Sequence, residues 1–174
     1  LELIKEELAE AGVAPSQMIS INFEDMRYSH LQTATALHDE IIKRAEGIEG
    51  KAYLFFDEIQ EVEGWEKCVN SLRVALDCDI YITGSNAKLL SGELATYIGG
   101  RYVEFVIYPF SFAEFLELYH TIAPSDSIQQ CFQKYLLAGG MPYLANLRYE
   151  EEPSRQYLTD LFNSVQLKDI VKRN

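Results

Sequence analysis

Hydrophobic residues in the first hundred positions alternate between helical spacing and short apolar runs. Apolar side chains recurring every three or four positions predict helices over residues 1–11, 31–48 and 65–76. Residues 18–23 alternate apolar and polar side chains, which is typical of a strand near a sheet edge. Residues 52–56 and 79–83 are short apolar runs of the kind that form buried strands. Because strands and helices alternate, the pattern predicts an α/β fold with a parallel sheet flanked by helices.

The pattern changes character after Pro109. Before it, residues 87–97 are predicted to form a helix, and residues 102–108 are predicted to form a further strand. After it, only helical spacing is found, beginning behind Ser111, which is a suitable N-cap residue. We therefore predict an α/β part over residues 1–109 and a small helical subdomain over residues 110–174.

Composition narrows the class of protein. The 174 residues are 48% hydrophobic and 24% charged, which suits one well-packed globular domain. The formal net charge of −12 argues against a nucleic-acid surface, because phosphate binding needs clustered Lys and Arg. The three cysteines have no metal-ligand spacing, and no apolar run is long enough for a membrane span. A cytoplasmic protein without a membrane segment fits these features best.

Candidate chemistry follows two of the predicted strands. Asp57 and Glu58 come directly after the apolar run 52–56, and Thr83, Ser85 and Asn86 come at the end of the next strand. Strand, helix and strand in this order form a βαβ unit, so all five side chains should share one edge of the sheet. Taken alone, the two carboxylates are equally well explained as a solvated acidic turn, and the second group as turn residues.

These residue types suit the hydrolysis of a nucleoside triphosphate. Asp57 could hold Mg²⁺ through its water shell, because a hard cation prefers oxygen ligands. Glu58 could act as the general base that polarises the attacking water. Thr83, Ser85 and Asn86 could hydrogen-bond that water or the γ-phosphate. The cofactors predicted from this set are ATP and Mg²⁺.

Five segments together resemble a known family. Residues 55–65, 81–91, 100–101, 108–115 and 139–142 are similar to the AAA-type P-loop ATPases of bacteria and archaea that carry a C-terminal DUF4143 domain. The resemblance implies a three-layer P-loop NTPase fold of the AAA/ASCE type, followed by a lid-like helical subdomain. It also implies that Asp57 and Glu58 form the Walker B pair, and that residues 83–86 form the sensor-1 region. Arg101 becomes a candidate arginine finger or phosphate-sensing residue, with a solvated residue at the start of a strand as the alternative.

One motif of that family is absent from the sequence. No stretch matches the phosphate loop GxxxxGK[ST], which supplies backbone N–H groups and a lysine to the phosphates. The resemblance therefore implies a chain that starts just after the Walker A motif. It also implies that a strand is absent between the sensor-1 strand and residues 102–108. We expect this to leave apolar edges unpaired, so that a chain of this sequence alone is unstable, rearranged or paired with another chain.

The leading hypothesis is an ATPase domain that binds and hydrolyses ATP in the intact protein. The alternative is a nucleotide-gated switch, in which ATP occupancy changes how residues 111–174 meet a partner and hydrolysis is slow or absent. A nucleic-acid-handling ATPase has little support, given the charge of −12. The expected partners are the nucleotide, a C-terminal domain of the same protein, and either a second copy of the chain or another protein.

Overall fold

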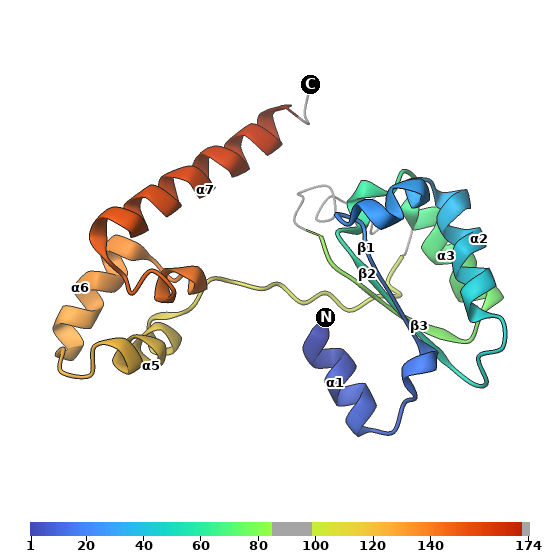
Figure 1. Cartoon of the computed structure of the whole chain (residues 1–174), viewed down its shortest axis with the longest axis horizontal. Coiled ribbons are helices and arrows are strands. Elements are labelled where there is room, and N and C mark those ends of the chain that lie inside the picture. The colour runs from blue at the N-terminus through green and yellow to red at the C-terminus, as the bar shows by residue number, and fades with distance from the viewer. Residues whose placement is uncertain (85–98, 172–174) are drawn as a thin grey trace. The chain divides into compact units, whose positions relative to one another are not determined.

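The chain divides into two compact units. The computed structural model describes residues 1–84 and 99–171, and the predicted helix over residues 87–97 lies outside that part. The first unit comprises Leu1–Val103 and the second Glu104–Asn174, and each is described here by itself (Figure 1). The predicted boundary at residue 109 stays a prediction.

The first unit contains a parallel sheet, as the alternating pattern predicted, and its three described strands have the order β1-β2-β3. Its strands are β1 (Met18–Asn22), β2 (Ala52–Asp57) and β3 (Cys78–Ile82). In this register Asn22 pairs with Asp57, and Phe56 pairs with Ile82. The residues that follow β1, β2 and β3 therefore lie at one edge of the sheet.

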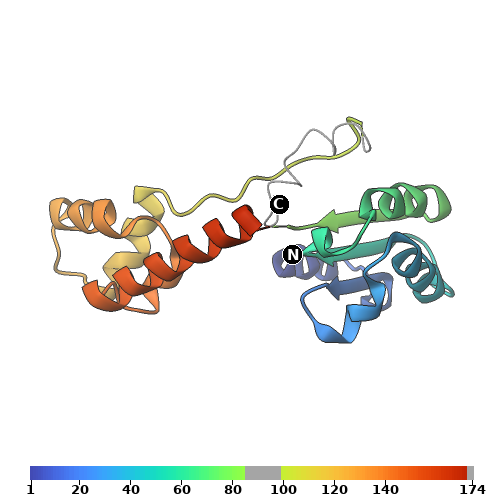
Figure 2. The same cartoon turned by 90° about the horizontal axis from the view of Figure 1, so that it is seen from above.

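Helices cover both faces of this sheet. The helices of the first unit are α1 (Glu2–Glu10), α2 (Ala34–Ala45) and α3 (Trp65–Ala75). Helices α2 and α3 lie side by side on one face of the sheet (Figure 2). They bury the side chains of Leu54 and Phe56 on that face. Helix α1 lies on the opposite face, where Lys5 Nζ donates to Ser20 Oγ at 2.8 Å and lies 5.3 Å from the centre of the Phe55 ring. The α/β class and the flanked parallel sheet are thus confirmed.

The predicted strand over residues 102–108 is wrong. Residues 101–111 carry neither helix nor strand, and side chains that a sheet would bury are exposed: Val103 by 78%, Phe105 by 82% and Ile107 by 89%. A strand forms only when the N–H and C=O groups of a neighbouring strand pair with its own. In the described part of the chain the sheet ends at β3, and no segment pairs with residues 102–108. Apolar composition alone therefore did not produce a strand.

The second unit is helical, as predicted. It contains α5 (Phe112–Ile122), α6 (Ile128–Ala138), a 3₁₀ turn (Pro142–Ala145) and α7 (Glu151–Val171). Ser111 begins α5 with a capping box, in which its hydroxyl accepts the Glu114 amide and the Glu114 carboxylate accepts the Ser111 amide. Phe115 lies fully buried at the centre of this unit's own core.

Tyr119 should make the helical unit sensitive to alkaline pH. Its side chain is buried, and its hydroxyl donates to Asp126 Oδ2 at 2.9 Å. Burial, and then the bond to Asp126, raise the pKa of Tyr119 from 10.0 to about 12. A raised folded-state pKa stabilises the fold below the unfolded-state pKa, so this contribution is present below pH 10 and is lost as pH rises toward about 12.

A titration of Tyr119→Phe tests this directly. We expect the wild-type protein to lose stability between pH 10 and about 12 more steeply than the variant, measured by urea unfolding at each pH. Equal pH slopes for the two proteins would contradict the assignment to Tyr119.

Candidate functional site

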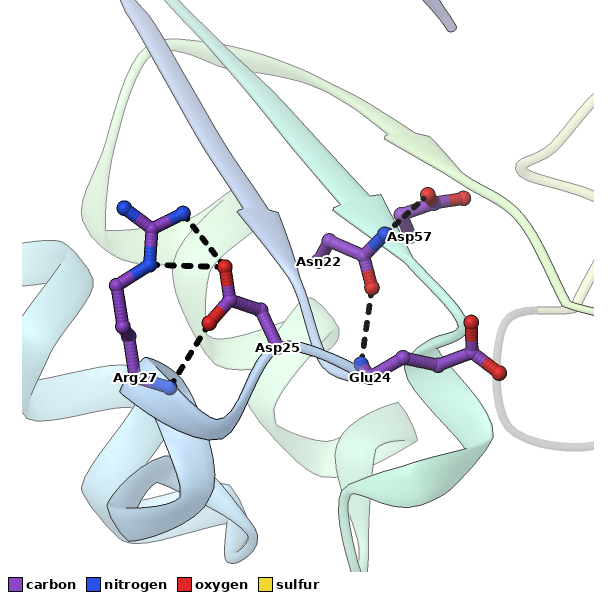
Figure 3. Close-up of polar contacts among 5 residues, drawn as sticks. All are labelled: Asn22, Glu24, Asp25, Arg27 and Asp57. Carbon is purple, nitrogen blue, oxygen red and sulfur yellow. Dashed lines mark hydrogen bonds and ion pairs between the residues drawn. The ribbon is translucent and has the colours of Figure 1, made fainter.

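The last residues of β1 and β2 meet at the carboxyl edge of the sheet. Asn22 Nδ2 donates to Asp57 Oδ2 at 3.0 Å, as Figure 3 shows. The other end of the same amide, Asn22 Oδ1, accepts the backbone N–H of Glu24 at 2.9 Å. Because both ends of the Asn22 amide are engaged, its orientation is set, and it holds one oxygen of the Asp57 carboxylate.

Thr83, directly after β3, contacts the same carboxylate from the other side. Its hydroxyl donates to Asp57 Oδ1 and also accepts the backbone N–H of Glu58 at 3.3 Å. Its backbone donates to Phe56 O at 2.9 Å and accepts the amide of Ile59 at 3.1 Å. Asp57 is therefore held between β1 and β3, one oxygen on each side.

Glu58 has an unusual backbone conformation. Its φ of 56° and ψ of 48° lie in the left-handed region, which is unfavourable for a residue with a Cβ. The residue begins a 3₁₀ turn over Ile59–Glu61, and Ile59 is fully buried. Left-handed non-glycine residues persist only where surrounding contacts determine them, and such residues cluster at functional sites.

The side chain of Glu58 contacts a residue of its own turn. Gln60 Nε2 donates to Glu58 Oε2, so the amide lies within the same turn as the carboxylate. The other end of the amide, Gln60 Oε1, is buried and has no hydrogen-bond partner among the described residues. The two adjacent carboxylates are thus oriented separately, Asp57 by neighbouring strands and Glu58 by its own turn.

Figure 3 shows one cationic side chain, Arg27, which is paired with Asp25. Arg27 Nε donates to Asp25 Oδ2 at 2.8 Å, and the Arg27 amide donates to Asp25 Oδ1 at 2.9 Å (Figure 3). These hydrogen bonds lower the pKa of Asp25 and raise the pKa of Arg27. The Arg27 guanidinium is therefore paired with the Asp25 carboxylate.

Three of the six predicted site residues come together. Asp57, Glu58 and Thr83 lie within one hydrogen-bonded cluster. Ser85 and Asn86 lie outside the described residues, so their placement stays a prediction. Arg101 is exposed, and it lies in the segment that forms neither helix nor strand, so its role also stays a prediction.

The prediction from sequence missed Asn22 and Gln60. Asn22 could have been found, because it ends the strand that precedes the carboxylate strand and parallel neighbours end at the same edge. Gln60 had no comparable signal, since its contact with Glu58 depends on the left-handed turn.

The donor set fits a magnesium ion bound mainly through water. Asp57 is partly exposed. Its carboxylate oxygens each accept one of the hydrogen bonds described above, Oδ2 from Asn22 and Oδ1 from Thr83. Among residues 1–84 and 99–171, no group of three or more His, Cys, Asp or Glu side chains could enclose a metal. Mg²⁺ commonly keeps several waters and takes one or two carboxylates together with phosphate oxygens, which agrees with this arrangement.

The fold and the site define an open α/β protein whose candidate ligand site lies at the carboxyl edge of a parallel sheet. The sequence profile of a family described as "AAA domain" matches residues 1–116, and the chain belongs to that family. No helix in the described ranges combines the length and apolar composition that a membrane crossing requires.

Two curated relatives match most of the chain. An uncharacterized protein of Haemophilus influenzae is 41% identical over 167 residues, which cover 95% of this chain and 41% of that protein. An uncharacterized protein of Methanocaldococcus jannaschii is 34% identical over 164 residues, which cover 90% of this chain and 36% of that protein. The chain thus spans less than half the length of either relative. No solved structure matches it.

Proposed function

We propose that the chain forms part of an ATPase domain that binds Mg·ATP and hydrolyses it in the intact protein. The observation that carries this proposal is the separate orientation of two adjacent carboxylates at the end of the central described strand. Asp57 is held by Asn22 and Thr83, whereas Glu58 is held by Gln60. A metal-organising carboxylate and a water-activating carboxylate need different orientations, and these contacts supply two.

Each carboxylate then has one role. Asp57, held by Asn22 and Thr83, would hold Mg²⁺ through water molecules. Glu58 accepts a proton from the attacking water as a general base. When bound, Mg²⁺ neutralises the charge that develops on the phosphate oxygens. Membership of the AAA domain family supports nucleotide as the ligand.

The remaining parts of the site are proposed from the family. Ser85 and Asn86 would contact the attacking water or the γ-phosphate, and Arg101 would stabilise the transferred phosphoryl group with its guanidinium fork. A phosphate loop elsewhere in the intact protein would supply the backbone N–H cradle. A C-terminal domain of the DUF4143 type is a further part proposed from the family resemblance. A second copy of the chain is a candidate partner if Arg101 acts in trans.

Asp57→Asn in the intact protein tests the metal role. We expect the wild-type protein to release phosphate from ATP in the presence of Mg²⁺ and to release none in excess chelator. The variant should need a higher Mg²⁺ concentration for the same rate, because its amide lacks the negative charge of the carboxylate. Asp77→Asn is the matched control, since Asp77 is exposed and precedes β3 at the opposite, amino edge of the sheet.

Several outcomes would separate the hypotheses. Equal Mg²⁺ dependence in the Asp57 and Asp77 variants would contradict the role of Asp57. Tight Mg·ATP binding without turnover, at every protein concentration, would contradict hydrolysis and support the nucleotide-gated switch. A turnover number per chain that rises with protein concentration would support an Arg101 that acts in trans.

A further inference from the structure

The turn that follows β2 contains two energetically unfavourable features. Glu58 has a left-handed backbone, and Gln60 Oε1 is buried without a hydrogen-bond partner among the described residues. A turn with both features relaxes unless neighbouring groups hold it. A residue outside the turn must therefore hold it in this shape.

Thr83 makes the contacts that such a role requires. Its hydroxyl accepts the amide of Glu58 at 3.3 Å, and its carbonyl accepts the amide of Ile59 at 3.1 Å. The same hydroxyl donates to Asp57 Oδ1. One residue after β3 therefore binds three consecutive residues, the two carboxylate residues and the buried Ile59.

The hydrogen-bonding capacity of a hydroxyl decides between two roles for Thr83. A threonine hydroxyl has a single O–H to donate. Here that O–H is given to Asp57, and an acceptor position of the oxygen faces the Glu58 amide. A phosphate oxygen is an acceptor and needs a donor, so no donor of this side chain remains for the γ-phosphate. This differs from the sensing role predicted for Thr83 from the sequence.

We propose that Thr83 is a positioning residue, which acts on the reaction through Asp57 and Glu58 and does not contact the nucleotide. This inference rests on the proposed ATPase function. The hydroxyl orients the Asp57 carboxylate and fixes the left-handed turn, and the turn places the Glu58 carboxylate beside the Gln60 amide. Phosphate sensing is then left to other residues of the site.

The experiment compares Thr83→Val with Thr83→Ser in the intact protein. Valine keeps the shape of threonine but has no hydroxyl, so it leaves Asp57 Oδ1 and the Glu58 amide without these bonds. Serine keeps the hydroxyl. We expect Thr83→Val to lower kcat for ATP by about 100-fold, because displacing a catalytic group by a small distance has an effect of this size. KM should stay unchanged. Thr83→Ser should keep the wild-type kcat.

Nucleotide binding distinguishes positioning from phosphate contact. If Thr83 does not touch the γ-phosphate, Thr83→Val keeps the wild-type ratio of ATP affinity to ADP affinity, measured with fluorescent nucleotides. A selective loss of ATP affinity in this variant would overturn the proposal. A wild-type kcat in Thr83→Val, or a lost kcat in a folded Thr83→Ser, would also overturn it.

Hydrogen exchange makes the inference testable apart from turnover. We expect Thr83→Val to lose protection at the amide of Glu58, which donates to the hydroxyl, while Thr83→Ser keeps it. Unchanged protection in Thr83→Val would contradict the proposal. If the wild-type protein shows no turnover, the ATPase function fails, and the exchange and affinity ratio still decide the role of Thr83. If Thr83→Val does not fold, Thr83→Ala takes its place in the exchange and affinity measurements, because alanine also lacks the hydroxyl.

Discussion

Replacing Glu58 by Gln in the intact protein is expected to lower steady-state ATP turnover by at least about 100-fold, since general-base catalysis contributes at least that much. The amide has nearly the shape of the carboxylate but cannot accept a proton from water. ATP affinity should stay close to that of the wild type, because Asp57 keeps its contacts with Asn22 and Thr83. Phosphate release and equilibrium nucleotide binding measure the two effects separately.

Glu63→Gln is the matched control for this substitution. Glu63 is an exposed carboxylate on the same connection between β2 and α3, and the change removes the same charge. We expect its turnover to equal that of the wild type. Unchanged turnover in Glu58→Gln would remove Glu58 from the catalytic site, and loss of turnover in both variants would indicate a general charge effect.

Replacing Phe56 by Ala is expected to give a large loss of stability in the sheet. Phe56 is fully buried, lies directly before Asp57, and packs on Phe23 with ring centres 6.1 Å apart. Removing a buried phenyl ring costs about 3–5 kcal/mol, because apolar contacts are lost and a cavity remains. That is a large part of the stability of a typical domain, which is about 5–15 kcal/mol.

Hydrogen exchange in Phe56→Ala and Phe115→Ala measures where stability is lost. Both side chains are fully buried, but they belong to separate cores in the two units. We expect Phe56→Ala to raise exchange within the first unit only, and Phe115→Ala to raise it within the second unit only. Exchange that rises throughout both units in either variant would contradict two separate cores.

The periodic segments could be predicted because their patterns reflect burial. The alternating β1 and the apolar β2 and β3 formed strands, and α2 and α3 formed helices where the helical spacing placed them. Residues 102–108 had an equally apolar pattern and formed no strand. The difference lies in the partner, because β1, β2 and β3 pair with one another and residues 102–108 pair with no described segment.

The sequence predicted residues that lie together at the candidate site, but not the contacts between them. Asp57, Glu58 and Thr83 followed from polar residues at the ends of neighbouring parallel strands. Asn22 and Gln60 depend on the strand register and on the left-handed turn at Glu58, which no local pattern indicates. The same contacts changed the role proposed for Thr83 from phosphate sensing to positioning.

The sequence by itself determined the α/β order of the first unit, the helical character of the second, and the edge at which the two carboxylates lie. These features follow from local patterns of burial and from the chirality of βαβ units. Only the tertiary structure decided the orientation of Asp57 and Glu58 and the fate of residues 102–108. Hydrogen bonds from Asn22 and Thr83, both far from the two carboxylates in the chain, hold Asp57 and the turn at Glu58. Residues 102–108 have no described strand with which to pair.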